Sequence, residues 1–405
     1  MESDLIIIGA GLVGASLLAA LKNSGFRIIV LESHIPISTQ TQPDSRPLTI
    51  NECSRRILET LGIWSTLQPW AEPIKTVHIS EQNRFGTLRF KAAEENLAAL
   101  GYVVPCDQLQ NQLCRKGTEN PAVKFVPLQK LLHIELEPDQ EVQVTVQTQQ
   151  GVLTVAAKLL VIADGAHSLA RQMLNIDVVK PLDQHKGIIF TVEFSQPHPP
   201  ICYERFTNQG IIAVLPLKNP LRCRIVWVAS DKLMAEMQHW SDQRWCDQLQ
   251  QVFHGRLKNC TMVDRGSVFP LETVLAKQQI KPGAVLLGNA AHTLYPLAAQ
   301  GFNLGLRDAA ALAEILVAAK KNQQSIGDLQ VLKQYQDWRT ADQRWITGLT
   351  LGISYLFEAP LPGLGMFRAG GLLATDLFEP LKRRLAKRFL GLSGKLPKLA
   401  RGISL

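Results

Sequence analysis

The stretch GAVLLGNAAHTLYPLAAQGFNLGLRDAAALAEILVAA occupies residues 283–319 and predicts a buried strand, an irregular loop and a long helix in immediate succession. Residues 284–287 form a short apolar run between glycines, and apolar residues recur at helical spacing from Leu304 to Leu316. Gly301, Phe302 and Asn303 would open this helix, so their backbone N–H groups would lack carbonyl partners at the positive end of the helix dipole. We expect an electron-rich group there, unless the stretch is an ordinary strand-loop-helix turn.

The amino terminus carries a dinucleotide-binding pattern. Residues 4–8 predict a buried parallel strand, and Gly9-x-Gly11-x-x-Gly14 joins it to a helix. Gly9 permits the tight turn, Gly11 lets the backbone approach a pyrophosphate, and Gly14 allows the helix to pack closely on the strand. A second strand ends at Glu32, whose carboxylate can accept hydrogen bonds from ribose hydroxyls. This pattern alone does not distinguish FAD from NAD.

The amino-terminal glycine motif and the stretch around Gly301 together favour a flavin. The N1–C2=O edge of an isoalloxazine ring becomes negative on reduction, which suits the helix start at Gly301. Arg46 is a further candidate for contact with the cofactor phosphates or the flavin edge, or else a surface arginine. Gln108, in a helix that begins near residue 107, could reach the cofactor. Asp164-Gly165 follows a core strand, at the edge where ligands bind in α/β sheets, although Asp164 could instead cap the next helix.

The strand pattern predicts a second sheet. Residues 76–90 read as an antiparallel hairpin, and successive strand candidates follow within residues 187–229. We therefore predict an α/β (mixed α+β) fold in three parts: a discontinuous FAD-binding domain (1–75, 100–180 and 270–320), a substrate domain (76–99 and 181–269) and a helical C-terminal region (321–405).

Cysteine spacing and charge exclude several classes of protein. The seven cysteines form no C-x-x-C pair and no zinc-ligand spacing, so we expect no metal site, no disulfide framework and a cytoplasmic location. The net charge of +8 resides in residues 381–405, which carry eight Lys/Arg and no acidic residue. A basic patch with interleaved aromatic residues is lacking elsewhere, which argues against nucleic acid as a partner.

The basic tail predicts membrane contact. Leu381, Leu385 and Phe389 recur at i, i+4 and i+8 between basic residues, the pattern of an amphipathic helix at an anionic membrane surface. No segment is apolar for long enough to span a bilayer. We expect peripheral binding to the inner face of the membrane; a solvated tail or a partner-docking tail are the alternatives.

Three motifs in order produce a family resemblance: Gly9-x-Gly11-x-x-Gly14, Ala163-Asp164-Gly165 and Gly288-x-Ala-Ala-His292-x-x-x-Pro296-x-x-x-Gln300-Gly301-x-Asn303-x-Gly305-x-x-Asp308. Over nearly the whole chain the sequence resembles the single-component flavin-dependent aromatic hydroxylases. Within them it resembles the ubiquinone-biosynthesis hydroxylases, with the 2-polyprenyl-6-methoxyphenol hydroxylases as the nearest branch. The resemblance implies a Rossmann-like FAD-binding domain with an inserted antiparallel-sheet substrate domain and a helical C-terminus.

The resemblance also implies a reaction and site roles. NAD(P)H would reduce FAD, O2 would add at flavin C4a as a hydroperoxide, and a polyprenylated phenol would take up the distal oxygen. Glu32 would bind the adenosine ribose, Asp164-Gly165 would lie near the pyrophosphate, and Pro296 would lie against the ring face. Gly288 and Asn289 belong to the third motif, where most of the wider family has aspartate in place of Asn289. Because an amide still makes hydrogen bonds but carries no charge, we interpret Asn289 as a marker of this branch.

Several alternatives stay open at this point. No catalytic side chain is assigned; His292 and Tyr295 lie in the right loop to accept a phenol proton, but His292 could equally brace the loop. The function could be that of a sister hydroxylase acting on another ring carbon, or of a flavoprotein reductase of prenyl double bonds. It could also be a subunit of a quinone-synthesis assembly that has lost the cofactor. Besides substrate and O2, the expected partners are a membrane surface or ubiquinone-biosynthesis proteins.

Overall fold

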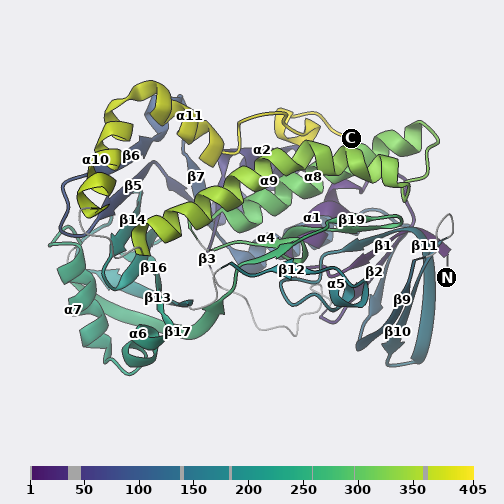
Figure 1. Cartoon of the computed structure of the whole chain (residues 1–405), viewed down its shortest axis with the longest axis horizontal. Helices are drawn as coiled ribbons and strands as arrows, with labels where there is room; N and C mark the ends of the chain where they lie inside the picture. Colours follow the sequence, from purple (N-terminus) through teal and green to yellow (C-terminus); the bar gives the residue numbers. More distant parts are fainter. Residues whose placement is uncertain are drawn as a thin grey trace.

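The computed structural model describes residues 2–34, 47–136, 141–181, 185–257, 259–295, 297–358 and 364–405. Two sheets lie at opposite ends of an elongated molecule, and long helices connect them (Figure 1). The domain bounds predicted from the sequence remain a proposal.

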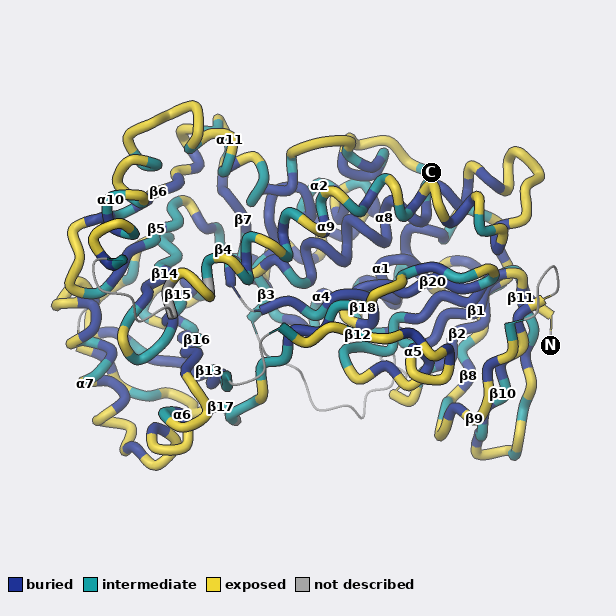
Figure 2. Tube along the Cα trace, in the orientation of Figure 1, coloured by how far each residue is buried: buried dark blue, intermediate teal, exposed yellow. Residues whose placement is uncertain are grey.

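The first sheet has the strand order β19-β20-β11-β1-β2-β8. Its parallel strands β20, β11, β1, β2 and β8 pair through apolar residues, as expected where both faces of a sheet are covered. Figure 2 shows β1, β2 and β20 largely buried, together with the end of β11 that pairs with them. β10 and β9 extend β11 as an antiparallel ribbon. The strands are β1 (Glu2–Ile8), β2 (Ile28–Glu32), β8 (Val123–Pro127), β9 (Lys130–Glu135), β10 (Val142–Thr148), β11 (Gly151–Ile162), β19 (Ile280–Lys281) and β20 (Ala284–Leu286).

Alternate residues of β1 enter different cores. Leu5 and Ile7 pack with helices on one face of the sheet, whereas Ile6 and Ile8 pack on the other face. The helices of the first face are α1 (Leu12–Ala20), α4 (Cys106–Gly117) and α8 (Gln300–Lys321), and α1 packs against both of the others. The two glycine motifs that open α1 and α8 therefore lie at neighbouring helices.

The second sheet has seven strands in the order β17-β13-β16-β15-β14-β5-β6. Most pairs are antiparallel as predicted, but β14 pairs with β5 in parallel. The reason is that β5 and β6 come from a separate, earlier hairpin, so no tight turn fixes their direction relative to β14. The strands are β5 (Thr76–Glu81), β6 (Thr87–Lys91), β13 (His185–Phe194), β14 (Ile201–Thr207), β15 (Gly210–Pro216), β16 (Arg222–Ser230) and β17 (Cys260–Leu271).

One face of the second sheet is sealed by α6 (Asp231–Met237) and α7 (Asp242–Val252). Trp227, Trp240 and Trp245 fill this core with ring centroids 5.1–6.5 Å apart. The opposite face of the sheet turns toward the first sheet and the site.

Two small sheets and the C-terminal helices complete the site region. β3 (Pro47–Asn51), β7 (Gly101–Pro105) and β4 (Glu72–Ile74) form one small sheet, and β12 (Val178–Val179), β18 (Val274–Ala276) and β21 (His292–Thr293) form the other. α9 (Leu329–Glu358) runs along α8 toward the second sheet, followed by α10 (Leu364–Leu377) and α11 (Glu379–Phe389) (Figure 1). Within the described part of the chain, no helix combines the length and apolarity needed to cross a bilayer. All seven cysteines are free, and no cluster of metal ligands occurs among the residues described.

Candidate functional site

The three sequence motifs meet at the carboxyl ends of three adjacent parallel strands. Ile8 of β1 pairs with Ile162 of β11, which pairs with Leu286 of β20. The loops that begin at Gly9, Ala163 and Leu287 therefore leave the sheet at the same level. In the sheet, β2 lies on one side of β1 and β11 lies on the other, so β1 marks the point where the order of strands reverses. Ligands of open α/β sheets bind in the crevice at such a switch point.

The glycines of the first motif serve two different purposes. A Cβ on Gly9, where φ is +95°, would lie 2.5 Å from the Ala163 carbonyl oxygen, and a Cβ on Gly14 would lie 2.0 Å from the Gly9 carbonyl oxygen. These two positions are fixed by packing. A Cβ on Gly11 would meet no atom within 4 Å, and the same holds for Gly165 and Gly301. Gly11, Gly165 and Gly301 thus leave open space where a bound group can approach the backbone.

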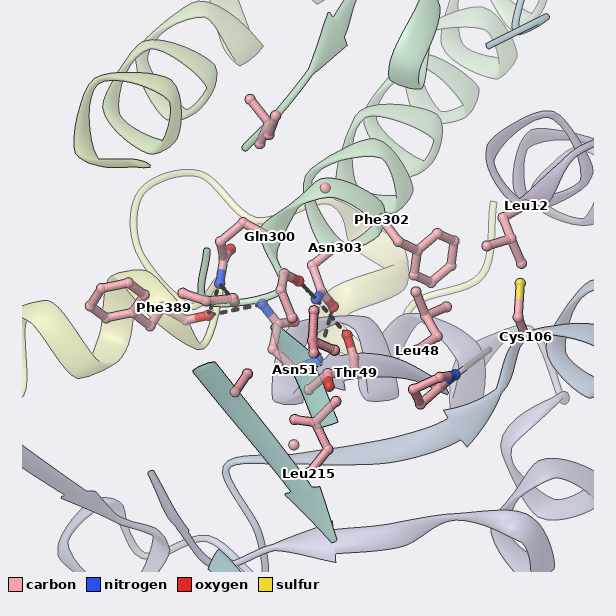
Figure 3. A pocket seen from close by; sticks show the side chains of 18 of the residues that line it. Leu12, Leu48, Thr49, Asn51, Cys106, Leu215, Gln300, Phe302, Asn303 and Phe389 are labelled. Carbon is pink, nitrogen blue, oxygen red and sulfur yellow. Dashed lines mark hydrogen bonds between the residues drawn. The ribbon is translucent and has the colours of Figure 1, made fainter. Parts of the chain in front are cut away.

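This space is part of one cavity of about 650 Å³ that reaches from the crevice to the second sheet (Figure 3). Gly11, Gly165, Asn289, Gly301 and Phe302 line it at the crevice. At the other end it is lined mainly by apolar residues of β5, β6, β14, β15, β16 and α11: Val77, Ile79, Phe90, Cys202, Ala213, Leu215, Val226, Ala386 and Phe389. A polar nucleotide crevice is therefore continuous with an apolar chamber.

Glu32 lies at the end of β2, beside the first glycine turn. Its Oε2 accepts a hydrogen bond from the Ala10 N–H at 2.5 Å, and its Oε1 accepts one from the His34 N–H at 2.9 Å. The carboxylate thus braces the loop. Because each carboxylate oxygen can accept more than one hydrogen bond, capacity for ribose hydroxyls remains.

Asp164 has one oxygen engaged and one without a partner. Oδ2 accepts a hydrogen bond from the Ala170 N–H at 3.3 Å, whereas the buried Oδ1 has none among the described residues. Burial raises the pKa of this carboxyl group. Arg171 fixes the loop by donating to the carbonyls of Ala290 and Ala166 at 2.8 and 2.9 Å. The helix-capping and ligand-binding interpretations of Asp164 are therefore compatible. The unpartnered oxygen can accept a hydrogen bond from a donor group of a bound nucleotide.

The start of α8 is open to the cavity. Its N-cap residue, Ala299, and the preceding Ala298 both have positive φ, at +49° and +54°, and no side chain caps the helix among the described residues. Gly301 and Phe302 line the cavity here. This end of the helix can therefore present backbone N–H groups to an electron-rich ring edge.

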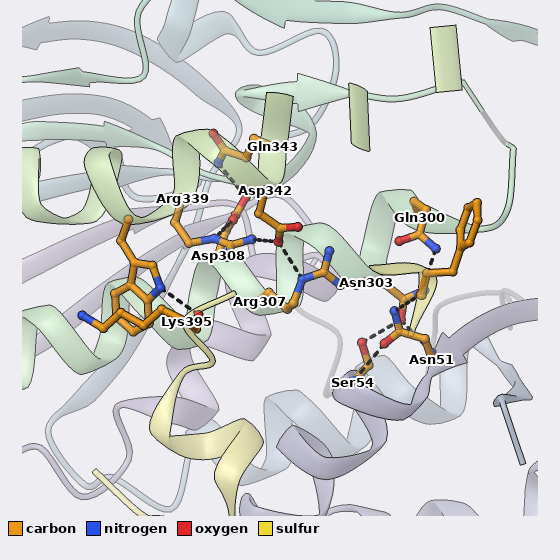
Figure 4. Close-up of polar contacts among 12 residues, drawn as sticks. Asn51, Ser54, Gln300, Asn303, Arg307, Asp308, Arg339, Asp342, Gln343 and Lys395 are labelled. Atoms are coloured by element: carbon orange, nitrogen blue, oxygen red, sulfur yellow. Dashed lines mark hydrogen bonds and ion pairs between the residues drawn. The ribbon is translucent and has the colours of Figure 1, made fainter. Parts of the chain in front are cut away.

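Asn303 contributes differently from what the sequence suggests. Its Nδ2 donates to the Thr49 carbonyl at 2.8 Å, and its Oδ1 accepts from the Asn51 N–H at 2.9 Å and the Ser54 hydroxyl at 2.6 Å (Figures 3 and 4). The side chain thus ties α8 to β3 and to α2 (Glu52–Thr60). Only its backbone is left to face a cofactor, and no sequence signal links Asn303 to Asn51, 252 residues away.

The helix that was expected to supply Gln108 instead supplies Gln110 to the cavity. Gln110 Nε2 donates to the Ala10 carbonyl at 3.2 Å and lines the cavity, while Gln108 is not among the lining residues. Gln110 lies one turn after the buried Cys106, so the helical phase could have indicated it. Arg46 and Pro296 lie outside the described residues.

His292 braces the third motif. Its Nε2 lies 2.6 Å from Oδ2 of the fully buried Asp308. Asp308 also accepts hydrogen bonds from Arg339 Nε at 2.5 Å and Gln343 Nε2 at 3.0 Å (Figure 4). Burial opposes ionisation of Asp308, but the charge of Arg339 and the hydrogen bonds outweigh it and hold the pKa at about 2. The contact favours the bracing role of His292 over that of a phenol-proton acceptor.

A glycine-lined nucleotide crevice that opens into an apolar chamber under a second sheet defines the class of flavin-dependent ring hydroxylases. The FAD binding domain family matches residues 2–346 of the chain. The chain is 32% identical over 395 residues to 3-demethoxyubiquinol 3-hydroxylase of Escherichia coli (strain K12), covering 96% of this chain and 99% of that protein. It is 28% identical to ubiquinone hydroxylase UbiL of Rhodospirillum rubrum, covering 100% and 94% of the two chains. The chain belongs to the FAD-dependent hydroxylases of ubiquinone biosynthesis.

The fold is shared with solved structures of low sequence identity. p-Nitrophenol 4-monooxygenase PnpA from Pseudomonas putida DLL-E4 superposes with a TM-score of 0.77 over 97% of this chain and 99% of its own, at 17% identity. The predicted Rossmann-like domain with an inserted sheet and a helical C-terminus is confirmed, as is FAD as the cofactor.

Proposed function

We propose that this chain hydroxylates a polyprenylated phenol of the 2-polyprenyl-6-methoxyphenol type, with NAD(P)H and O2 as co-substrates. The observation that carries the proposal is the continuity of the cavity, which joins the glycine-lined crevice to an apolar chamber. A polyprenylated ring needs an apolar environment of this kind next to the flavin.

The residues present fit FAD. Gly11 lies at the start of α1 with open space for a pyrophosphate. Glu32, which contacts the first glycine turn, would bind the ribose hydroxyls. The start of α8 at Gly301 suits the flavin ring edge. Gly165, Gly288 and Asn289 would line the cofactor between its pyrophosphate and its ring. When bound, FAD supplies oxygen activation after reduction by NAD(P)H. The protein orients the ring, and the apolar side chains exclude water from it.

A sister hydroxylase that acts on another ring carbon is the second candidate. It is favoured by the 32% identity to a protein named for 3-hydroxylation of a demethoxyubiquinol. Both candidates share the cofactor and the cavity, and they differ only in how the ring is seated.

The reaction is tested with the purified protein and short-chain analogues of both substrates. We expect a yellow protein whose NAD(P)H oxidation is stimulated by substrate, coupled to O2 consumption and to a product heavier by one oxygen atom. NMR of the product identifies the ring carbon and so separates the two candidates. A colourless protein that cannot take up FAD, or a product that lacks the added oxygen, would contradict the proposal.

We further propose that the enzyme binds an anionic membrane surface, with the basic residues of α11 as predicted but with apolar contacts that lie mainly outside the predicted helix face. Leu385 and Phe389 of α11 pack on a core formed by Leu88 and Phe90 of β6, so they do not form a free apolar face. Of the predicted face only Leu381 stays exposed, at 42%. The most exposed apolar side chains of this region belong to α10 and the corner after it: Met366, Phe367, Leu377 and Phe378, with exposed fractions of 66%, 77%, 75% and 60%. We call these four residues the α10 patch.

Charge and position support this surface. Arg383, Arg384 and Lys387 of the adjacent α11 are exposed, which suits anionic headgroups. The same helix lines the cavity with Ala386 and Phe389. A membrane-dissolved substrate would therefore meet the protein next to its apolar chamber.

A further inference from the structure

One carboxylate interrupts an otherwise apolar wall of the cavity. In the second sheet, residues that are paired across five adjacent strands form one row: Ile79, Glu204, Ala213, Val226 and Ile189. All five residues line the cavity. Glu204 is the only member of this row that is not an aliphatic residue, and its side chain is 8% exposed.

Glu204 reaches the loop that leads to the flavin-facing helix. Its Oε1 accepts a hydrogen bond from the Ala298 N–H at 2.9 Å, two residues before α8 begins. Among the described residues, Oε2 makes no hydrogen bond. It is also not one of the polar atoms that are shut off from solvent without a partner, so it stays accessible from the cavity. The carboxylate thus bridges the apolar wall and the flavin-facing loop, with one oxygen left for a ligand.

A purely structural role does not explain the charge. A glutamine at this position would accept the Ala298 hydrogen bond equally well and would avoid the cost of burying an ionisable group. Buried carboxyl groups in a cavity, with perturbed pKa values, occur preferentially where proton transfer is needed. Burial raises the pKa of Glu204, which brings its basicity closer to that of a phenolate.

Few titratable groups surround Glu204. On β14 the neighbour on the same face is Cys202, whose pKa is raised by burial and by the charge of Glu204. The other titratable side chains that line the cavity are Cys106 on α4 and Tyr295 in the loop before α8. The facing positions on β5, β15, β16 and β13 are aliphatic, so among the described residues Glu204 is the sole acidic group of the chamber.

We propose that Glu204 accepts the proton of the substrate's ring hydroxyl. The inference rests on the proposed function and assigns the proton acceptor that the hydroxylation needs. The phenol O–H bond breaks as an O–H bond forms on Glu204 Oε2, and the negative charge moves onto the ring, whose carbon then bonds one oxygen atom of O2. The newly bound oxygen carries one proton taken from solvent. The other oxygen atom ends as water, with the proton from Glu204 and the hydrogen that NAD(P)H delivers as a hydride together with the two electrons. The ring C–H proton moves to the ring oxygen as aromaticity returns.

Glu204→Gln tests this role while it keeps the Ala298 contact. At pH 7 we expect kcat for hydroxylation to fall by about 100-fold or more, with KM changed by less than about three-fold. The ratio of the wild-type kcat to the variant kcat should shrink by about ten-fold per pH unit toward pH 10, because a phenol ionises by itself near that pH. Glu193→Gln, which neutralises a half-exposed carboxylate on β13 of the same sheet, should behave as the wild type. A deficit that is equal at every pH would show that Glu204 only positions the loop and would overturn the proposal.

A binding measurement separates this inference from the proposed function. The probe is a nitrophenol with one short isoprenoid tail, added to the FAD-loaded protein at a pH one unit below the pKa of the probe. Difference spectra should show the phenolate band with the wild type and its loss with Glu204→Gln. The same phenolate band in both proteins would refute the role of Glu204. A wild type that ionises the probe but forms no hydroxylated product would leave Glu204 as a phenol-binding base and refute the proposed function alone.

Discussion

Gly11 shows how a single residue can leave room for a ligand beside the backbone. Its φ of −62° and ψ of −176° are accessible to any residue, so conformation does not require glycine here. What glycine provides is the open space in front of the first turn of α1. The motif therefore combines two glycines needed for packing, Gly9 and Gly14, with one needed for ligand approach.

Gly11→Val should fold but bind FAD poorly. The added Cβ would meet no protein atom within 4 Å, and the branched side chain would occupy the space proposed for the pyrophosphate. We expect FAD affinity to fall at least ten-fold, about 1.4 kcal/mol, measured by flavin fluorescence titration of the apoprotein. Gly348→Val, at an exposed glycine of α9 with equally open surroundings, is the matched control. Unchanged FAD affinity in Gly11→Val would place the pyrophosphate elsewhere.

At the scale of elements, a buried ionic cluster clamps α8 to α9. Asp308 and Arg307 of α8 face Arg339 and Asp342 of α9, with Arg307 Nε 2.9 Å from Asp342 Oδ2 (Figure 4). Asp308 is fully buried, and Arg339 is 3% exposed. Because α8 begins where we propose that the flavin ring edge lies, this clamp fixes the helix that would orient the ring.

Asp308→Asn should destabilise the protein strongly. It leaves the guanidinium of Arg339 with a weaker partner inside the protein, and breaking a buried pair costs about 3–5 kcal/mol. Denaturant unfolding measures the loss. Asp337→Asn removes a carboxylate from the exposed side of α9 and should change stability by less than about 0.5 kcal/mol. Equal midpoints for Asp308→Asn and the wild type would show that the cluster does not hold the helices together.

The same cluster predicts a dependence on pH. The folded-state pKa of Asp308 is about 2, below its ordinary value of 3.8. Its ionised form therefore stabilises the fold fully above about pH 4, and this contribution is lost as pH falls through about 2. The stability difference between the wild type and Asp308→Asn should narrow over this range in acid unfolding experiments. A difference that stays constant down to pH 2 would argue against the assignment.

At the scale of the whole molecule, α10 and α11 lie at one end together with the second sheet (Figures 1 and 2). The α10 patch is therefore at the same end as the sheet that lines the apolar chamber. Deleting the tail after residue 380 would not test membrane binding cleanly. The Phe389 carbonyl accepts from Asn51 Nδ2 at 2.9 Å and from Gln300 Nε2 at 3.3 Å, so the deletion would also disturb the site. Point substitutions in the patch avoid this problem.

The double variant Met366→Ser/Phe367→Ser should lose membrane binding but keep catalysis. Burying each of these side chains contributes about 1.5–3 kcal/mol, so flotation with vesicles that contain anionic phospholipid should fall at least ten-fold. Turnover of a water-soluble, short-chain substrate should not change. Val152→Ser, at a side chain of β11 that is 64% exposed, controls for the loss of any exposed apolar group. Flotation that matches the wild type would exclude the patch as the contact.

The sequence by itself determined the features that depend on neighbours along the chain. The apolar strand before Gly9, the core strand before Asp164 and the strand before Gly288 each predict a loop at a carboxyl end. Parallel strands of one sheet end at the same edge, which is why three distant motifs converge on one crevice. The sequence left the bracing role of His292 as one of two open interpretations, and it is the contact with Asp308 in the folded chain that favours this role.

Only the tertiary structure decided the features that depend on contacts between distant segments. It placed Gln110 rather than Gln108 at the cavity, joined β5 to β14 in parallel, and packed Leu385 and Phe389 of α11 against β6. It also engaged the side chain of Asn303 with β3 and set Glu204 into an apolar wall. Periodicity shows that a helix or strand has an apolar face but not what covers that face. That depends on residues hundreds of positions away, which only the folded chain brings together.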